Sequence, residues 1–140
     1  MTHRRRTQLC TMLVLFGLIN IMTYTVAYAY VGGDAWNGDV EGGRYFVRGH
    51  FLRSVEGHRS PVSRTVWIYS YVHSITIWPS LAAILLSMLV LARPHIMATF
   101  REGWINGSTL IGAIATLVIL ITLIGTVVFC LSFGAALARA

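Results

Sequence analysis

Three long runs without a charged residue constrain this chain more than any other feature. They extend from about residue 9 to 31, from about 66 to 92, and from about 107 to 138. About 20 residues let a helix cross the hydrocarbon core of a bilayer, so each run is long enough. The third exceeds that length and is expected to tilt or to project beyond the core. We therefore predict an all-α membrane protein, residues 1–140, with three transmembrane helices in a single integral membrane domain.

The composition agrees with this prediction. Charged residues make up 11% of the chain and apolar residues 56%, whereas a soluble domain carries about 25% charge. The net charge of +6 comes entirely from arginine. In a soluble protein such an excess would suggest nucleic-acid binding, but these arginines flank the apolar runs, where they act as topology signals. We expect the lipid bilayer and other membrane protein subunits as partners, and no nucleic acid.

The arginines also bear on orientation. With three spans, five arginines would lie on the side of the amino terminus and six on the other side, so the count alone does not decide. A compact cluster at the first helix usually dominates, and Arg4, Arg5 and Arg6 form one. We therefore predict a protein of the bacterial inner (plasma) membrane with a cytoplasmic amino terminus, while the reverse orientation stays open.

The loop between the first two runs, residues 32–65, is the one substantial aqueous segment, with about 34 residues. Its glycines mark turns. We predict a short β-hairpin within residues 44–55, with strands at 45–47 and 51–52 that turn around 48–50. Too few apolar residues lie here to bury a core, so the loop needs its own helices or a partner for support.

Aromatic residues cluster at the two span ends that join this loop, as expected of an interfacial belt. From this belt we select Trp36 and Trp67 as contacts for lipid or a partner. The loop arginines are further candidates, because a guanidinium binds phosphate or carboxylate in a bidentate manner. The candidates are Arg44, Arg48 and Arg53.

The acids and histidines of the loop match no known metal-site spacing, and arginines lie between them. We interpret them as solvated turn residues and predict no metal site. They are Asp34, Asp39, Glu41, His50 and His58.

Each apolar run carries small or polar residues on one helical face. Helices in hydrocarbon associate through small residues and interhelical hydrogen bonds, so we predict a three-helix bundle with these faces inward. The faces are residues 17, 20, 24 and 27 in the first run, and 73, 76, 80, 83 and 87 in the second. In the third run they are 108, 112 and 116, followed by 122, 126, 130 and 134.

His73 is the most informative polar residue, because an imidazole in hydrocarbon is costly without hydrogen-bond partners. It lies about seven residues into the second run, and Tyr24 lies at a similar depth in the first. We predict a contact between Tyr24 and His73, with Asn20 or Thr76 nearby. Ser80 completes this set of intramembrane polar contacts.

The function expected from these features is that of an accessory or stabilising subunit of a larger membrane protein complex. The runs contain no acid and no arginine, and no catalytic motif can be assembled, so neither an enzyme nor an ion-coupled transporter is expected. One alternative is a cofactor-binding anchor of an electron-transfer complex, with His73 as a haem or chlorophyll ligand. We favour the interpretation without a cofactor. A further alternative is a freestanding immunity or regulatory protein.

Three helices in 140 residues with one histidine in the second, His73, resemble the membrane-anchor subunits of quinone-linked dehydrogenases. That resemblance implies a haem-binding role for the histidine. The chain lacks the histidine–arginine and histidine–aspartate signatures that such anchors carry, so the resemblance does not assign it to that family.

Overall fold

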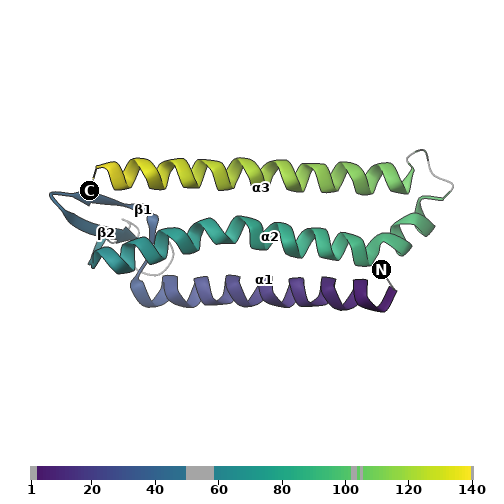
Figure 1. The fold of residues 1–140 in the computed structure, drawn as a ribbon, viewed down its shortest axis with the longest axis horizontal. Coiled ribbons are helices and arrows are strands. Elements are labelled where there is room, and N and C mark those ends of the chain that lie inside the picture. Colours follow the sequence, from purple (N-terminus) through teal and green to yellow (C-terminus); the bar gives the residue numbers. More distant parts are fainter. Residues whose placement is uncertain (1–2, 50–58, 102–103, 105, 140) are drawn as a thin grey trace.

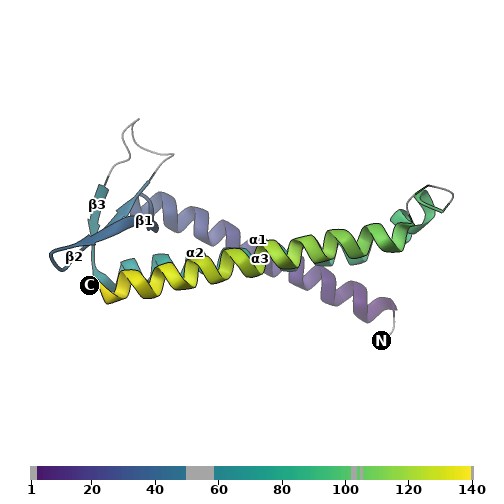
Figure 2. The same cartoon turned by 90° about the horizontal axis from the view of Figure 1, so that it is seen from above.

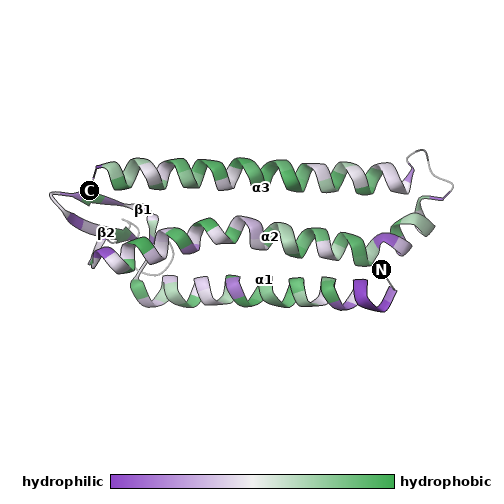
Figure 3. Cartoon of the chain, in the orientation of Figure 1, coloured by the Kyte–Doolittle hydropathy of each residue, from purple (hydrophilic) through white to green (hydrophobic). Residues whose placement is uncertain are grey.

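Three long helices and a small sheet make up the computed structural model, which describes residues 3–49, 59–101, 104 and 106–139. The helices are α1 (His3–Val31), α2 (Arg64–Thr99) and α3 (Gly107–Ala138), and the strands are β1 (Asp34–Glu41), β2 (Arg44–Arg48) and β3 (Arg59–Val62) (Figure 1). All three helices are long and apolar enough to cross a membrane. Figure 3 shows hydrophobic residues along most of their length, with hydrophilic residues at the start of α1 and near both ends of α2.

The helix limits follow the apolar runs except at the start of α1, which begins at His3, and at the end of α2. The second apolar run ends at about residue 92, whereas α2 continues through Pro94 to Thr99. Side-chain caps begin both later helices. Ser63 Oγ accepts a hydrogen bond from the Val66 N–H, and Asn106 Oδ1 accepts one from the Ser108 N–H. Such caps satisfy backbone donors that the first turn leaves free.

The helices form an open layer, which corrects the predicted closed bundle. α1 and α3 each pack along α2 and make hardly any contact with one another. Figure 1 shows α2 between the other two. From above, α3 runs close to the direction of α2, whereas α1 crosses it at a clear angle (Figure 2). Among the described residues, α2 is therefore the only helix with two packed sides.

One glycine brings each outer helix close to α2. A Cβ on Gly17 of α1 would lie 2.6 Å from Cγ1 of Ile84, and a Cβ on Gly125 of α3 would lie 2.5 Å from the indole of Trp78. Both glycines are buried. Small residues permit this close approach between membrane helices, so Gly17 receives the Ile84 side chain and Gly125 receives the Trp78 ring.

The inward face of α3 differs from the prediction. Gly112 and Gly134 belong to the predicted face, but a Cβ on either would meet no described atom within 4 Å. Cys130 is exposed as well. The predicted steps of four residues drift around a helix that has 3.6 residues per turn. The side that packs on α2 follows alternating steps of three and four, through Thr122, Gly125 and Phe129.

The sheet has the order β1-β2-β3 with antiparallel neighbours. The predicted hairpin was placed wrongly, because the turn lies at Gly42 and Gly43 and not at residues 48–50. Both glycines have positive φ, +57° and +74°, as the two-residue turn that favours strand twist requires. The second predicted strand, residues 51–52, lies outside the described residues.

A small aromatic core joins the sheet to the helix ends. Ala35, Val47, Trp67 and Tyr71 are buried together, and Phe133 of α3 contacts both Trp67 and Tyr71. Trp67 is only 1% exposed, which corrects its assignment to an outward-facing aromatic belt. The loop has few apolar residues of its own, and the aromatic residues of α2 and α3 supply the rest of the core.

Candidate functional site

A cluster of polar side chains lies between α1 and α2, inside the apolar layer. Asn20 Nδ2 donates to Ser80 Oγ at 2.8 Å and to Thr76 Oγ1 at 3.1 Å. Each hydroxyl in turn donates to a backbone carbonyl of α2: Ser80 to Thr76 at 2.8 Å, and Thr76 to His73 at 2.7 Å. The amide of Asn20 thus connects α1 to α2 where both are otherwise apolar.

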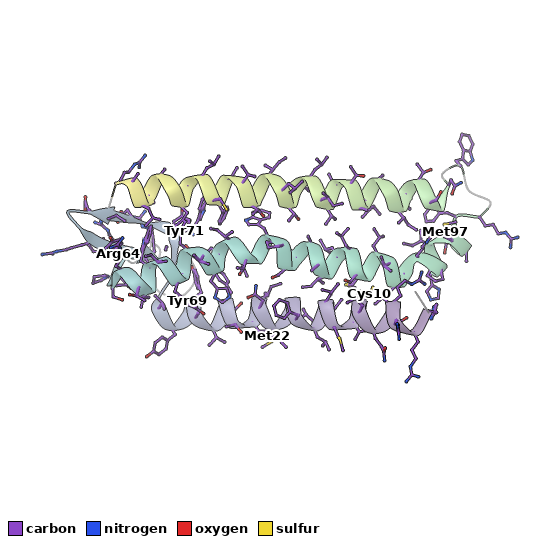
Figure 4. The ribbon with its side chains drawn as sticks, viewed as in Figure 1. Cys10, Met22, Arg64, Tyr69, Tyr71 and Met97 are labelled. Carbon is purple, nitrogen blue, oxygen red and sulfur yellow. The ribbon has the colours of Figure 1, made fainter. Side chains whose placement is uncertain are left out.

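His73 is 8% exposed and has a partner for each ring nitrogen. Nε2 lies 3.3 Å from the backbone oxygen of Asn20, and Nδ1 lies 3.1 Å from the hydroxyl of Tyr69. A carbonyl oxygen only accepts hydrogen bonds, so Nε2 carries the proton in this contact. In the corresponding neutral tautomer, Nδ1 accepts from the Tyr69 O–H. Figure 4 shows Tyr69 on the side of α2 that faces α1.

Tyr24 contacts His73 through its ring, with an edge-on geometry and centroids 5.5 Å apart. Its hydroxyl points elsewhere and donates to Asp34 Oδ2 at 2.7 Å. The predicted contact between Tyr24 and His73 is therefore a ring contact. The hydrogen-bond partners of His73 are Tyr69 and the Asn20 backbone. The ring of Tyr24 therefore lies between the polar cluster and the start of the sheet.

Asp34 is 6% exposed, which corrects its interpretation as a solvated turn residue. Besides the bond from Tyr24, its Oδ1 accepts from the backbone N–H of Asn37 at 3.0 Å and from Nδ2 of Asn37 at 2.8 Å. A buried carboxylate needs such donors, because burying an unsatisfied charge is costly.

The first two residues of β1 attach the sheet to two different helices. Asp34 binds Tyr24 of α1, and the N–H of Ala35 donates to Ser70 Oγ of α2 at 3.1 Å. On α3, Phe129 stacks on Trp36 of β1 with centroids 3.7 Å apart. Three successive residues of β1 thus contact all three helices, and we call residues 34–36 the β1 anchor.

Three charged side chains of the sheet form a cluster on its exposed part. Arg59 of β3 binds Asp39 at 2.6 Å and Glu41 at 2.8 Å, and its guanidinium lies 3.7 Å from the ring centre of Phe46. The hydrogen bond with Glu41, followed by that with Asp39, raises the pKa of Arg59 above its ordinary value. These acids are paired with Arg59.

Of the arginines predicted as partner contacts, those that the structure describes do not belong to this charged cluster. Arg44 is exposed at the hairpin turn. Arg48 lies opposite Asp34 in the register of β1 and β2. The Nε atom of Arg48 is buried without an acceptor among the described residues. Arg53 lies outside the described residues, as do His50 and His58.

Several residues of this region escaped the sequence reasoning although a signal existed. Tyr69 precedes His73 by four residues, which places both on one helical face. Asp34 directly follows two glycines at the end of an apolar run and precedes Asn37 by three, a spacing typical of a local side-chain-to-backbone bond. Ser70 carried no comparable signal, because its acceptor role depends on where β1 folds back.

Comparison with protein-family models, curated proteins and solved structures finds no match. The arrangement is therefore interpreted from its own chemistry. It joins helices and holds a sheet, and its hydroxyls, amide and imidazole are engaged with one another. The candidate site consists of the polar cluster around Asn20 and the β1 anchor. It fixes the relative positions of α1, α2 and the sheet.

Proposed function

We propose that this chain is an accessory subunit of a larger membrane protein complex, to which it contributes a transmembrane scaffold and a small sheet. The observation that carries the proposal is the position of α3. Among the residues of α3, all of which the structure describes, only Gly107 and Gly125 are buried, and the small residues Ser108, Gly112 and Thr116 are exposed.

The partner that suits this face is a transmembrane helix of another subunit. Leu, Ile and Val are as apolar as lipid tails, so apolar area alone gives membrane helices little reason to associate. Small residues favour association, because they let two helix backbones approach closely. The intramolecular contacts of this chain follow the same rule at Gly17 and Gly125. Gly112 offers a further position of this kind, with no described atom within 4 Å of an added Cβ.

Co-purification from native membranes tests the proposal. A tagged chain is expected to retain another membrane protein, and Gly112→Leu is expected to release it without unfolding the chain. The matched control is Ala113→Leu, also exposed and about 100° around the helix at the same depth. The wild-type chain purifying alone would contradict the proposal and favour a freestanding immunity or regulatory protein. Capture of nothing but a second copy would contradict it too.

The anchor of an electron-transfer complex is the alternative that His73 suggests. It fits the geometry less well, because both ring nitrogens already have partners. A haem or chlorophyll would have to displace either Tyr69 or the Asn20 carbonyl. An absorption spectrum of the purified chain separates the two functions. The accessory-subunit proposal expects no band that disappears with His73→Ala, and such a band would establish the cofactor alternative.

A further inference from the structure

We propose that one anionic phospholipid binds in a groove along the first turns of α1. The groove measures about 620 Å³ and follows one side of the helix. Arg4, Gln8, Thr11, Met12 and Leu15 line it in this order from the amino terminus. Pockets for small ligands measure about 300–1,000 Å³, so the groove has room for part of a lipid. It lies on α1, whereas the partner proposed above binds α3, so neither proposal depends on the other.

The groove is open to the bilayer. The residues that line it all belong to α1, and Figure 2 shows the first turns of α1 diverging from the direction of α2 and α3. Met12 and Leu15 are 67% and 55% exposed. Nothing in the described part of the chain therefore covers this side of the helix, and a lipid can reach it from the surrounding membrane.

Three hydrogen-bond donors in the groove lack a partner. Within the described residues, no acid forms an ion pair with Arg4, and no group bonds to the Gln8 amide or the Thr11 hydroxyl. Thr7 differs, because its hydroxyl donates to the His3 carbonyl at 3.1 Å. Hydrocarbon offers no acceptor to an exposed donor, so these three donors favour a ligand rich in acceptor oxygens.

The order of the side chains along α1 matches the order of groups in a diacyl phospholipid. The Arg4 guanidinium suits the phosphate, and Gln8 and Thr11 can donate to the ester carbonyls of the glycerol backbone. Met12 and Leu15 then lie against an acyl chain. Arg4 and Thr11 are about 10 Å apart along the helix axis, and the apolar run begins at about residue 9. The groove thus changes from ionic to polar to apolar as it enters the membrane.

The charge at this end of the molecule favours an anionic lipid. Three of the five acids belong to β1, which lies at the opposite end (Figure 1), and Glu102 lies outside the described residues. Arginines close to a bilayer surface attract anionic lipids. The described charged residues at the start of α1 and around the end of α2 are all arginines, namely Arg4, Arg5, Arg6, Arg93 and Arg101.

Lipid titration of the purified, delipidated chain by native mass spectrometry tests the assignment. One phosphatidylglycerol should bind about fivefold more tightly than phosphatidylcholine, whose choline cation offsets the charge of the phosphate. A factor of about five is the contribution of one arginine near an anionic surface. Inorganic phosphate, which lacks the ester groups and the chains, should not bind at equal concentration.

Two substitutions separate the phosphate contact from the ester contacts. Arg4→Gln should weaken phosphatidylglycerol binding about fivefold and so remove the preference over phosphatidylcholine. Arg5→Gln is the matched control, because Arg5 is also exposed and lies about 100° around the helix, and it should change binding far less. Gln8→Leu should weaken the binding of both lipids alike, because both carry the same ester carbonyls.

The three substituted side chains are exposed, so each variant should keep the lipid-free melting temperature of the wild type. Equal binding of the two lipids by the wild-type chain would overturn the proposal. So would equal losses with Arg4→Gln and Arg5→Gln, which would indicate diffuse attraction to the surface. Equally tight binding of inorganic phosphate would replace the lipid site by a free-anion site. Absence of lipid binding, with a co-purified protein lost in Arg4→Gln, would instead assign the groove to an acidic helix of a partner.

Discussion

At the scale of single residues, the molecule depends on polar groups that satisfy one another within an apolar layer. Asn20, Thr76 and Ser80 bond across α1 and α2, and His73 uses both ring nitrogens. In hydrocarbon an unsatisfied polar group has no water to bind, so these contacts specify which faces of the helices meet. Measured hydrogen bonds between membrane helices are nonetheless worth only about 1 kcal/mol.

Replacing Asn20 with leucine tests that value. Asn20→Leu removes the donor to both hydroxyls and should lower the free energy of unfolding in detergent by about 1 kcal/mol. Thr23→Val is the control, because Thr23 lies on the same helix and its hydroxyl donates to the Ile19 carbonyl within that helix. Equal effects of the two substitutions would mean that the interhelical bonds contribute nothing specific.

Asp34 should matter more to the sheet than the exposed acids do. Its carboxylate accepts three hydrogen bonds, and Asp34→Asn would replace one of its oxygens by a donor, which should cost about 1–3 kcal/mol. The loss should appear as faster amide exchange in β1 and β2. Asp39→Asn, at an exposed ion pair, should change exchange far less. Protection that stays intact in Asp34→Asn would exclude the β1 anchor as the attachment of the sheet.

At the scale of elements, the helices and the strand β2 could be predicted, and the rest of the sheet could not. Apolar runs long enough to span a bilayer placed α1 and α3 closely, because no other structure buries its backbone polar groups in hydrocarbon. The hairpin was misplaced because its first strand, β1, contains Asn37, Gly38 and Asp39, residues disfavoured in strands. Glycines at 42 and 43 signalled the turn, but the β-prone segment 45–47 drew the predicted hairpin towards the following residues.

The contacts between helices could be predicted where polar residues form them. They were missed where the ring of a large side chain packs against a glycine. Asn20 and Ser80 indicated the correct faces of α1 and α2. Nothing in the sequence pairs Gly125 with Trp78, because that contact depends on how far α3 is shifted along α2. Steps of three and four both fit a helix face, so the step of four alone misplaced Cys130 and Gly134.

Two glycines of α3 allow the observed and the predicted contact faces of α3 to be compared by experiment. Gly125→Leu should separate α3 from α2, because its Cβ would already lie 2.5 Å from the Trp78 ring, and overpacking of this kind costs about 1–3 kcal/mol. Gly134→Leu should be nearly neutral, since open space surrounds that position. Thermal unfolding in detergent compares the two. A larger loss for Gly134→Leu would place the contact face of α3 where the sequence first suggested.

At the scale of the whole molecule, three helices in one layer place the sheet and the carboxyl end of α3 at one end and the start of α1 at the other (Figure 1). Within the part of the chain that the structure describes, only α2 is covered on both sides by other helices. α1 and α3 therefore keep long apolar surfaces that lipid or another subunit must cover, which is the basis of the proposed function.

Orientation can be measured with a thiol-reactive reagent that does not cross membranes. In a chain whose two cysteines are replaced by serine, Glu41→Cys should react from outside intact cells, because the predicted orientation places the sheet opposite the cytoplasm. Acidic residues contribute little to topology, so this replacement should not itself turn the protein. Trp104→Cys, at the other end, should react only after the membrane is opened. The opposite labelling pattern would reverse the assigned orientation.

The mass of the particle extracted from native membranes without detergent tests the central claim most directly. Polymer-bounded discs keep neighbouring subunits and lipids together, and their protein content can be weighed by native mass spectrometry. As an accessory subunit, this chain of 15.5 kDa should be found with at least one different membrane protein in fixed proportion. Discs that contain the 15.5 kDa chain and lipid alone would contradict the account.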